Sequence, residues 1–144
     1  MSEYASSLLC VVNATRREWG RPDLEPQRNL RRAAQWQADD MEADDYFSHT
    51  SADGETLAER LEQAKFIPRS DRWRAGENIA AGHDHAGSPA AIVRGWMNSR
   101  PHRVNLLDSG FTMAGIGVAR GWPGGDYPDE DAITIALDLG WRRP

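Results

Sequence analysis

The sequence predicts a single α+β domain whose sheet is antiparallel. Apolar residues at helical spacing dominate residues 5–98, whereas two β-type runs, residues 111–119 and 132–139, come last. Helices and strands therefore do not alternate as they would in a parallel βαβ fold. The chain has 144 residues, 40% of them hydrophobic, and no internal repeat, so we expect one packed domain over residues 1–144.

The first predicted helix covers residues 5–19. Leu8 and Val12, one turn apart, belong to its apolar stripe, and a Gly/Pro loop follows it. Cys10 lies in the same apolar run and is interpreted as a small buried residue. Because it is the one cysteine, no disulfide can form within the chain.

The second predicted helix covers residues 28–45. Leu30, Ala34, Ala38 and Met41 recur there at spacings of three and four, which gives the helix a core-facing stripe. It ends just before the segment FSHTS, so this segment is expected to begin a loop.

A third, short helix is predicted over residues 56–64. Thr56 followed three residues later by Glu59 is a capping-box pattern, which gives Glu59 a structural task at the start of the helix. Residues 76–82 follow a polar loop and are interpreted as a compact, mixed stretch bounded by glycines.

A fourth helix is expected over residues 89–98, with Ser88 as its N-cap. Pro101 interrupts the helical pattern, so residues 102–107 are predicted to form a last short turn. Residues 121–131 are rich in Gly, Pro and Asp and connect the two β-type runs.

The charge balance argues against a nucleic-acid-binding protein. Asp and Glu number 22 against 17 Lys and Arg, a net charge of −5, whereas binding to phosphates needs a basic surface. No apolar run approaches the roughly 20 residues that cross a bilayer. The N-terminal apolar run is short and has no basic region before it, so it does not match a signal peptide. Either a leader was removed from an exported protein, or the protein is cytoplasmic.

Three short polar motifs contain the candidate functional residues. They are FSHTS with His49, GENIA with Glu77, and WMNSRPHRVNLL with His102. Two imidazoles and a carboxylate could bind zinc or another divalent metal, or the carboxylate could act as a general base beside a metal-bound water. The alternative is structural: the histidines are hydrogen-bonding loop residues, and Glu77 accepts backbone N–H bonds that tie a loop to the sheet.

The order of the motifs resembles the bacterial branch of the CAP superfamily, the SCP/PR-1-like domain. FSHTS, GENIA, W-x-x-S-x-x-HR-x-N-L, GIGVA and a strand ending in LDLG follow one another at compatible spacing, from about Leu8 to Gly140. The resemblance implies a three-layer α-β-α sandwich with a small antiparallel sheet between helical layers. It also implies a cleft that two histidines and two acids line in many members.

Carried over by motif, the resemblance implies that His49, His102 and Glu77 line this cleft. By their chemistry, we expect His49 and His102 to be the metal ligands and Glu77 to be the catalytic residue. Asn78 and Ser99 are expected to line the same cleft. Ser99 stands where eukaryotic members place a second Glu, so the cleft is expected to lack one carboxylate.

The preferred hypothesis is a secreted or envelope-associated binding domain. Its cleft would take zinc, another divalent metal or a small ligand, and its partner would be a lipid, a cell-wall component or a protein. A metal-assisted peptidase and a lipid or sterol carrier are the alternatives, because both activities are associated with members of the family. The expected protein is a monomer without a transmembrane segment and without a nucleic-acid partner. Whether it is an enzyme stays open.

Overall fold

The computed structural model describes residues 2–123 and 131–144, and over these ranges the chain forms five α-helices and a four-stranded sheet. In chain order the elements are α1 (Glu3–Glu18), β1 (Glu25–Pro26), α2 (Arg28–Ala43), α3 (Leu57–Gln63), β2 (Trp73–His83), the 3₁₀ turn η1 (Asp84–Gly87), α4 (Pro89–Met97), α5 (Arg100–Leu106), β3 (Met113–Arg120) and β4 (Ala132–Arg142). Most of the predicted connector, residues 121–131, lies outside the described residues.

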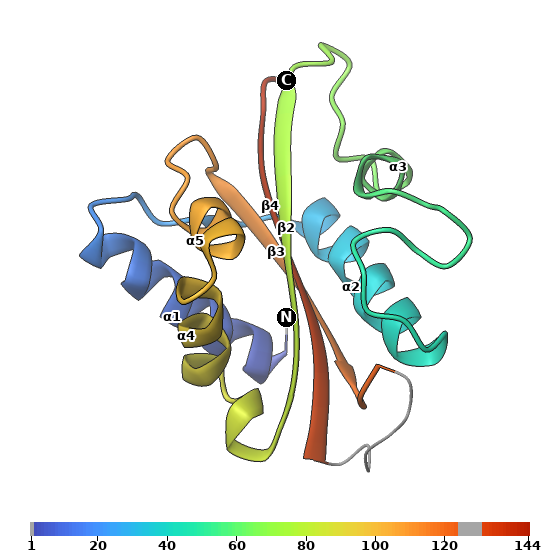
Figure 1. Ribbon diagram of the computed structural model, residues 1–144. Helices are drawn as coiled ribbons and strands as arrows, with labels where there is room; N and C mark the ends of the chain where they lie inside the picture. The colour runs from blue at the N-terminus through green and yellow to red at the C-terminus, as the bar shows by residue number, and fades with distance from the viewer. Residues whose placement is uncertain (1, 124–130) are drawn as a thin grey trace.

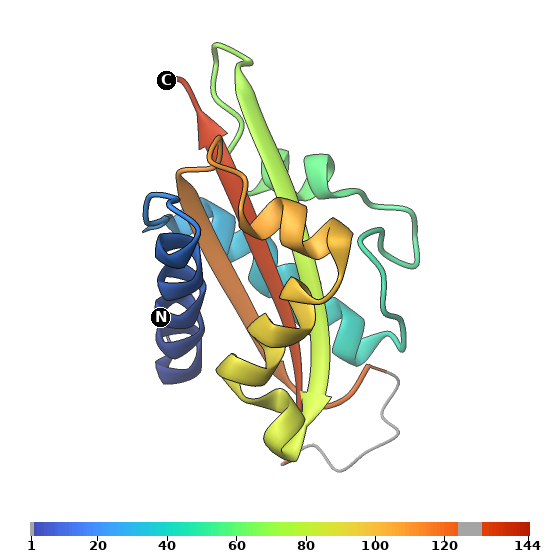
Figure 2. The same ribbon diagram turned by 60° about the vertical axis from the view of Figure 1, so that its left-hand side comes forward.

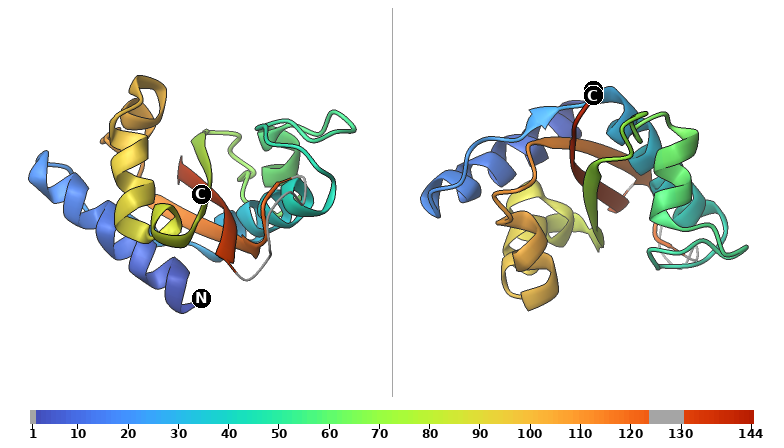
Figure 3. Two further views of the ribbon diagram at one scale, coloured as in Figure 1. Left: turned by 60° about the horizontal axis from the view of Figure 1, so that its bottom comes forward. Right: turned by 90° about the horizontal axis from the view of Figure 1, so that it is seen from above.

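The sheet lies between two helical layers (Figure 1). α1, α4 and α5 cover one face, and α2 and α3 cover the other (Figures 1 and 3). The strand order is β1-β3-β4-β2, with β4 antiparallel to both of its neighbours and the two-residue β1 parallel to β3. The α+β class and the layered architecture are therefore confirmed. The sheet as a whole is mixed, because β1 adds a short parallel pairing to three antiparallel strands.

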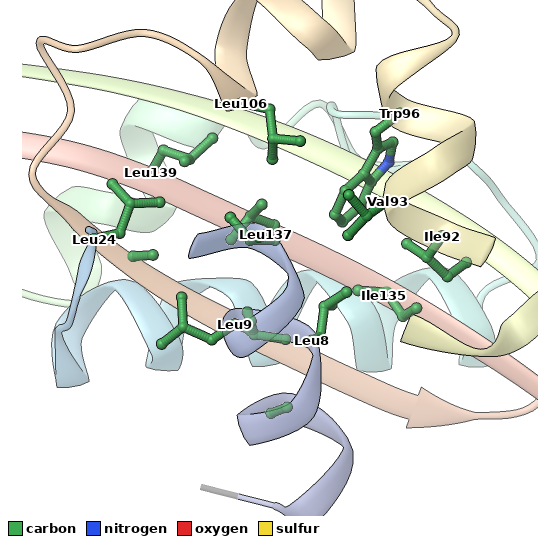
Figure 4. Close-up of a cluster of buried hydrophobic side chains, with 14 of the residues drawn as sticks. Leu8, Leu9, Leu24, Ile92, Val93, Trp96, Leu106, Ile135, Leu137 and Leu139 are labelled. Carbon is green, nitrogen blue, oxygen red and sulfur yellow. The ribbon is translucent and has the colours of Figure 1, made fainter. Parts of the chain in front are cut away.

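The larger core fills the space between the sheet and the layer of α1, α4 and α5. Figure 4 shows Leu8, Trp96 and Leu137 gathered from α1, α4 and β4, and all three side chains are buried. A smaller core on the other face contains Leu30 of α2 and Phe66 after α3. Each fully buried Leu or Phe contributes about 1.5–3 kcal/mol, so these two cores hold the three layers together.

α2 packs directly on β3 through the GIG segment. A Cβ atom at Gly115 would lie 2.0 Å from the backbone N of Arg31, and one at Gly117 would lie 2.2 Å from the carbonyl O of Ala34. Such distances are far below van der Waals contact, so only glycine allows the helix to approach the strand this closely. The GIGVA motif therefore has a packing role.

One buried polar side chain of α1 ties this helix to distant segments. Arg16 is fully buried, although arginine is rarely found in that state without partners. Its guanidinium donates to four carbonyl oxygens, those of Pro22, Leu106, Asp108 and Phe111. These bonds fix the end of α5 and the loop before β3 against α1.

The structure corrects the prediction for residues 76–82. They are the middle of β2, an 11-residue strand, and not the compact, mixed stretch that was predicted. The flanking glycines have the pattern of a loop, while Glu77, Asn78 and Ile79 are all buried because helices cover both faces of the strand. Burial on both faces removes the alternation by which a strand is usually found.

Two further predictions are wrong. Residues 102–107 belong largely to α5 and do not form an isolated turn, because Pro101 lies in the first turn of the helix, where its missing N–H is not needed. Cys10 is exposed. It lies two residues from Leu8 and from Val12, and two residues turn a helix by about 200°, so its side chain faces away from the core.

Candidate functional site

A cavity of about 370 Å³ lies beside β2, an edge strand of the sheet. Its lining comes from residues 79–81 of β2, from Trp96, Ser99 and His102 in the α4–α5 layer, and from Phe47 in the loop after α2. Figure 2 shows β2 at the front edge of the sheet, with α4 and α5 on one side and the loop between α2 and α3 on the other. We call this cavity the cleft.

His49 is held in place by a buried carboxylate. Its Nδ1 lies 3.0 Å from Oε1 of Glu77, and the side chain of His49 is 53% exposed while that of Glu77 is 1% exposed. Arg60 donates from Nη2 to both oxygens of Glu77, at 3.1 and 3.0 Å, and from Nη1 to the carbonyl O of His49, at 3.0 Å. Because Nδ1 is engaged, Nε2 is the nitrogen of His49 that remains for a ligand.

The charge of Glu77 results from opposing effects. Burial disfavours its ionised form, but the hydrogen bond from His49 and the positive charge of Arg60 outweigh burial, so the pKa of Glu77 is lowered. Glu77 is therefore an anion at neutral pH, with both oxygens occupied by Arg60 and one also by His49.

Asp138 is a second acid of this site, and the sequence motifs did not predict it. It lies directly opposite Glu77 on β4 and is fully buried, and its two side-chain oxygens have no hydrogen-bond partner among the described residues. Burial and the charge of Glu77 raise the pKa of Asp138 well above its usual value. A proton on Asp138 removes the repulsion between the two carboxyl groups, and the raised pKa of Asp138 favours this form.

Arg60 and Asp138 do carry a signal in the sequence. Leu57, Leu61 and Ala64 put Arg60 on the apolar stripe of its helix, and Asp138 lies in a mostly apolar strand. A charged residue at such a position is rarely buried without a partner. The positions therefore indicate a buried pair, although they do not name the partners.

Asn78 and Asn105 attach α5 to β2. The amide of Asn78 donates to the carbonyl O of His102 at 3.0 Å, and that of Asn105 donates to the carbonyl O of Glu77 at 3.3 Å and to Oδ1 of Asn78 at 3.1 Å. These bonds position His102 at the cleft. Burial, and then the charge of His49, lower the pKa of His102, so its ring is neutral at pH 7.

The predicted site residues have different positions relative to the cleft. Ser99 and His102 line it, and Ser99 makes no side-chain capping bond at the start of α5. His49 is not among the residues that line the cleft, although it lies close enough to His102 for its charge to affect the pKa of His102. Glu77 and Asn78, which were also expected to line the cleft, are buried behind its wall and are not among the residues that line it.

The side chains at the cleft do not form a complete donor set for a metal. In the described part of the chain, no three His, Cys, Asp or Glu side chains come together in a way that could bind a metal ion. Glu77 is occupied by Arg60, so only Nε2 of His49 and the imidazole of His102 remain. Zinc sites use three or four protein ligands. These residues therefore do not fit a resident zinc ion.

The fold and the cleft define a class of protein: a three-layer domain that carries two histidines beside an edge strand of its central sheet. The profile of the Cysteine-rich secretory protein family, CAP, matches residues 9–135, and the chain belongs to this family. Over residues 2–123 and 131–144, no helix is both long and apolar enough to cross a membrane.

Bacterial relatives share the fold. The chain is 38% identical over 113 residues to the membrane protein YlbC of Bacillus subtilis (strain 168), a match that covers 78% of the chain but only 31% of that relative. An extracellular protein of Bacillus anthracis that contains an SCP domain matches with a TM-score of 0.75 and 28% identity, over 97% of this chain and 40% of that one. An outer surface protein of Borrelia burgdorferi matches with a TM-score of 0.77 and 20% identity, over 99% and 95% of the two chains. The chain thus spans about a third of YlbC and nearly all of the Borrelia protein.

Proposed function

We propose that this chain is a ligand-binding domain that acts outside the cell or in the cell envelope. The proposed location is supported by the relatives, because the matching Bacillus anthracis protein is extracellular and the Borrelia burgdorferi protein lies on the outer surface. The proposed binding function is supported by the cleft.

The observation that carries the proposal is the chain of contacts from Arg60 through Glu77 to His49. Burying an ion pair removes both charges from water, which is unfavourable unless the geometry is good. Here the buried pair fixes the ring of a half-exposed histidine beside a cavity. Buried charges that orient an exposed titratable group next to a cavity are typical of binding sites and active sites.

The lining suggests an organic ligand with polar and apolar parts. The ring of His102 and the hydroxyl of Ser99 offer polar contacts, while Phe47 and Trp96 offer apolar surface. His49 does not line the cleft, but it lies close enough to His102 for its charge to act there, and its Nε2 remains for a ligand. A zinc ion would find only two histidine ligands and would need the remaining ligand atoms from outside the chain. The proposal therefore assigns the cleft to an organic molecule.

The test uses Gly95, which lines the cleft on α4. A Cβ atom at this position would meet nothing within 4 Å, so the helix has room for a side chain here, and Gly95→Leu is chosen to narrow the cleft. Ligand-observed NMR would screen amino acids, dipeptides, N-acetylated sugars and short fatty acids against the wild type, Gly95→Leu and the control Gly95→Ala. We expect one class to bind the wild type and Gly95→Ala and to lose binding in Gly95→Leu. Binding that is unchanged in Gly95→Leu, or no binding by any class, would contradict the proposal.

A hydrolase is the second candidate, and one observation favours it. A carboxylate bonded to Nδ1 fixes the tautomer and the orientation of a histidine that acts as a general base through Nε2. Glu77 has this relation to His49. Mass spectrometry of a defined peptide mixture, incubated with the wild type and with His49→Ala, tests the candidate. Cleavage that His49→Ala abolishes would support it, and an undigested mixture would reject it while leaving the binding proposal intact.

A further inference from the structure

β2 presents backbone groups to the cleft. It is the last strand in the order β1-β3-β4-β2, so one of its edges has no neighbouring strand among the described residues. Asn105 on α5 donates to the carbonyl O of Glu77, and the indole Nε1 of Trp96 on α4 donates to the carbonyl O of Ile79, both from outside the sheet. In a strand, backbone groups on one edge belong to alternate residues. The N–H and C=O groups of Glu77, Ile79 and Ala81 therefore point outward.

Part of this edge is open. The carbonyl oxygens of Glu77 and Ile79 are occupied by the side chains of Asn105 and Trp96. In contrast, the described residues provide no hydrogen-bond partner for the N–H of Ile79 or for the N–H and C=O of Ala81. Both residues line the cleft. The cleft thus contains two backbone donors and one backbone acceptor in the alternation of a strand.

We propose that the cleft binds an extended peptide segment of another protein, which pairs with the edge of β2 at Ile79 and Ala81. The inference rests on the proposed binding function and names its ligand class. A peptide residue opposite Ala81 accepts from its N–H and donates to its C=O. The N–H of Ile79 lies two residues along, about 7 Å away, and bonds a carbonyl on the same edge of the peptide.

The walls of the cleft suit a peptide strand. Successive side chains of an added strand point to opposite sides. One set would face α4, where Ala91 and Gly95 leave room, and the other would face the loop that carries Phe47. Fatty acids and sugars lack the regular alternation of donors and acceptors that this edge offers, so a peptide uses the open groups best.

The inference can be tested with a phage-displayed library of linear heptapeptides, selected on the wild-type domain. Ala81→Pro removes the outward N–H and leaves the pairing of β2 with β4 intact, since proline is tolerated on an edge strand where the N–H faces solvent. Ala75→Pro is the matched control, because Ala75 has the same orientation on β2 but does not line the cleft. A second measurement, independent of protein variants, is N-methylation of each amide of a selected peptide.

We expect the selected peptides to bind the wild type and Ala75→Pro equally and to bind Ala81→Pro about fivefold to tenfold more weakly, the effect of one lost hydrogen bond. N-methylation should weaken binding at alternate peptide positions. Equal binding to Ala81→Pro without an alternating N-methyl pattern would overturn the edge pairing, and so would a library that yields no binder.

These outcomes separate the two proposals. Peptides that bind Ala81→Pro normally but fail on Gly95→Leu would reject edge pairing and support a binding cleft. Peptides that bind Ala81→Pro and Gly95→Leu as well as they bind the wild type would reject both proposals. If no peptide is selected, the small-molecule screen with Gly95→Leu still decides the function of the cleft.

Discussion

Glu77 and Asp138 are opposite each other on neighbouring strands, and both carboxyl groups are buried. Arg60 supplies one positive charge to this pair. If both acids were ionised, one negative charge would remain without compensation in a buried position, which is strongly unfavourable. A proton on Asp138 makes the group of Arg60, Glu77 and Asp138 neutral. The raised pKa of Asp138 favours this protonated form.

The first prediction concerns Asp138→Asn, which replaces a protonated carboxyl by a neutral amide of similar shape. Because the pKa of Asp138 is raised, its stabilising contribution is fully present below the usual value of 3.8 and is lost as the pH rises through the raised pKa. Asn does not titrate. We therefore expect the variant to gain stability relative to the wild type as the pH increases, measured by urea unfolding between about pH 5 and 9. An equal loss of stability at every pH would mean that Asp138 is ionised in the folded protein.

The second prediction concerns the ion pair. Arg60→Met leaves Glu77 buried without its cation, and removing one partner of a buried pair destabilises a protein by about 3–5 kcal/mol. The double variant Arg60→Met/Glu77→Leu should recover part of this lost stability, because it has no charged side chain at position 77 that would need a partner. Urea unfolding measures both free energies. A double variant that is less stable than the single one would contradict this account.

The third prediction concerns the contact between α2 and β3. Gly117→Ala places a Cβ atom 2.2 Å from the carbonyl O of Ala34, so the helix must move away from the sheet. Overpacking of this kind destabilises by about 1–3 kcal/mol or more. Gly95→Ala is the control, since its Cβ meets nothing within 4 Å and alanine favours a helix by up to about 1 kcal/mol. Thermal unfolding should show opposite changes in Tm for the two variants.

The fourth prediction concerns His102. NMR titration of its ring should give a pKa below the usual 6.5, because burial and then the charge of His49 disfavour the protonated form. His49→Ala should raise this pKa part of the way, since burial remains. Because the pKa of His102 is lowered in the folded protein, the unfolded chain binds this proton more readily. The free energy of unfolding should therefore decrease as the pH falls below 6.5. A pKa that does not change in His49→Ala would show that the two rings do not interact.

The fifth prediction concerns zinc. Two histidines do not make a tight zinc site, so calorimetric titration of the wild type at neutral pH should show no saturable binding near one ion per chain. The double variant His49→Ala/His102→Ala should give the same heats. Saturable one-to-one binding that disappears in the double variant would instead identify a metal site and would reverse our assignment of the cleft.

Local features of the fold could be predicted from the sequence because their causes lie within a few residues. The capping box of Thr56 and Glu59 is present, with the backbone N–H of Glu59 bonded to the hydroxyl of Thr56 and the carboxylate of Glu59 bonded to the backbone N–H of Thr56. Ser88 caps α4 as predicted, by accepting from the N–H of Ala91. β2 was missed because its burial depends on helices far away in the chain.

The candidate site could be predicted only in part, for the same reason. The motifs identify His49 and Glu77 as candidates. They do not predict the hydrogen bond between the two residues, which lie 28 positions apart in the sequence. The bonds from Arg60 to Glu77 and the opposition of Glu77 and Asp138 are also tertiary relationships. A charge inside an apolar pattern indicates that a partner exists, and only the folded arrangement identifies it.

The position of β4 has a consequence for the order in which the molecule assembles. β4 covers residues Ala132–Arg142 and lies between β2 and β3. Until that segment has been synthesised, β2 has no strand partner and β3 has only the two-residue β1. On the ribosome, the preceding residues therefore lack the sheet on which their helices pack. Folding of the domain therefore waits for the synthesis of β4. Until β4 is in place, the chain lacks the central sheet and so the surface on which both helical layers pack.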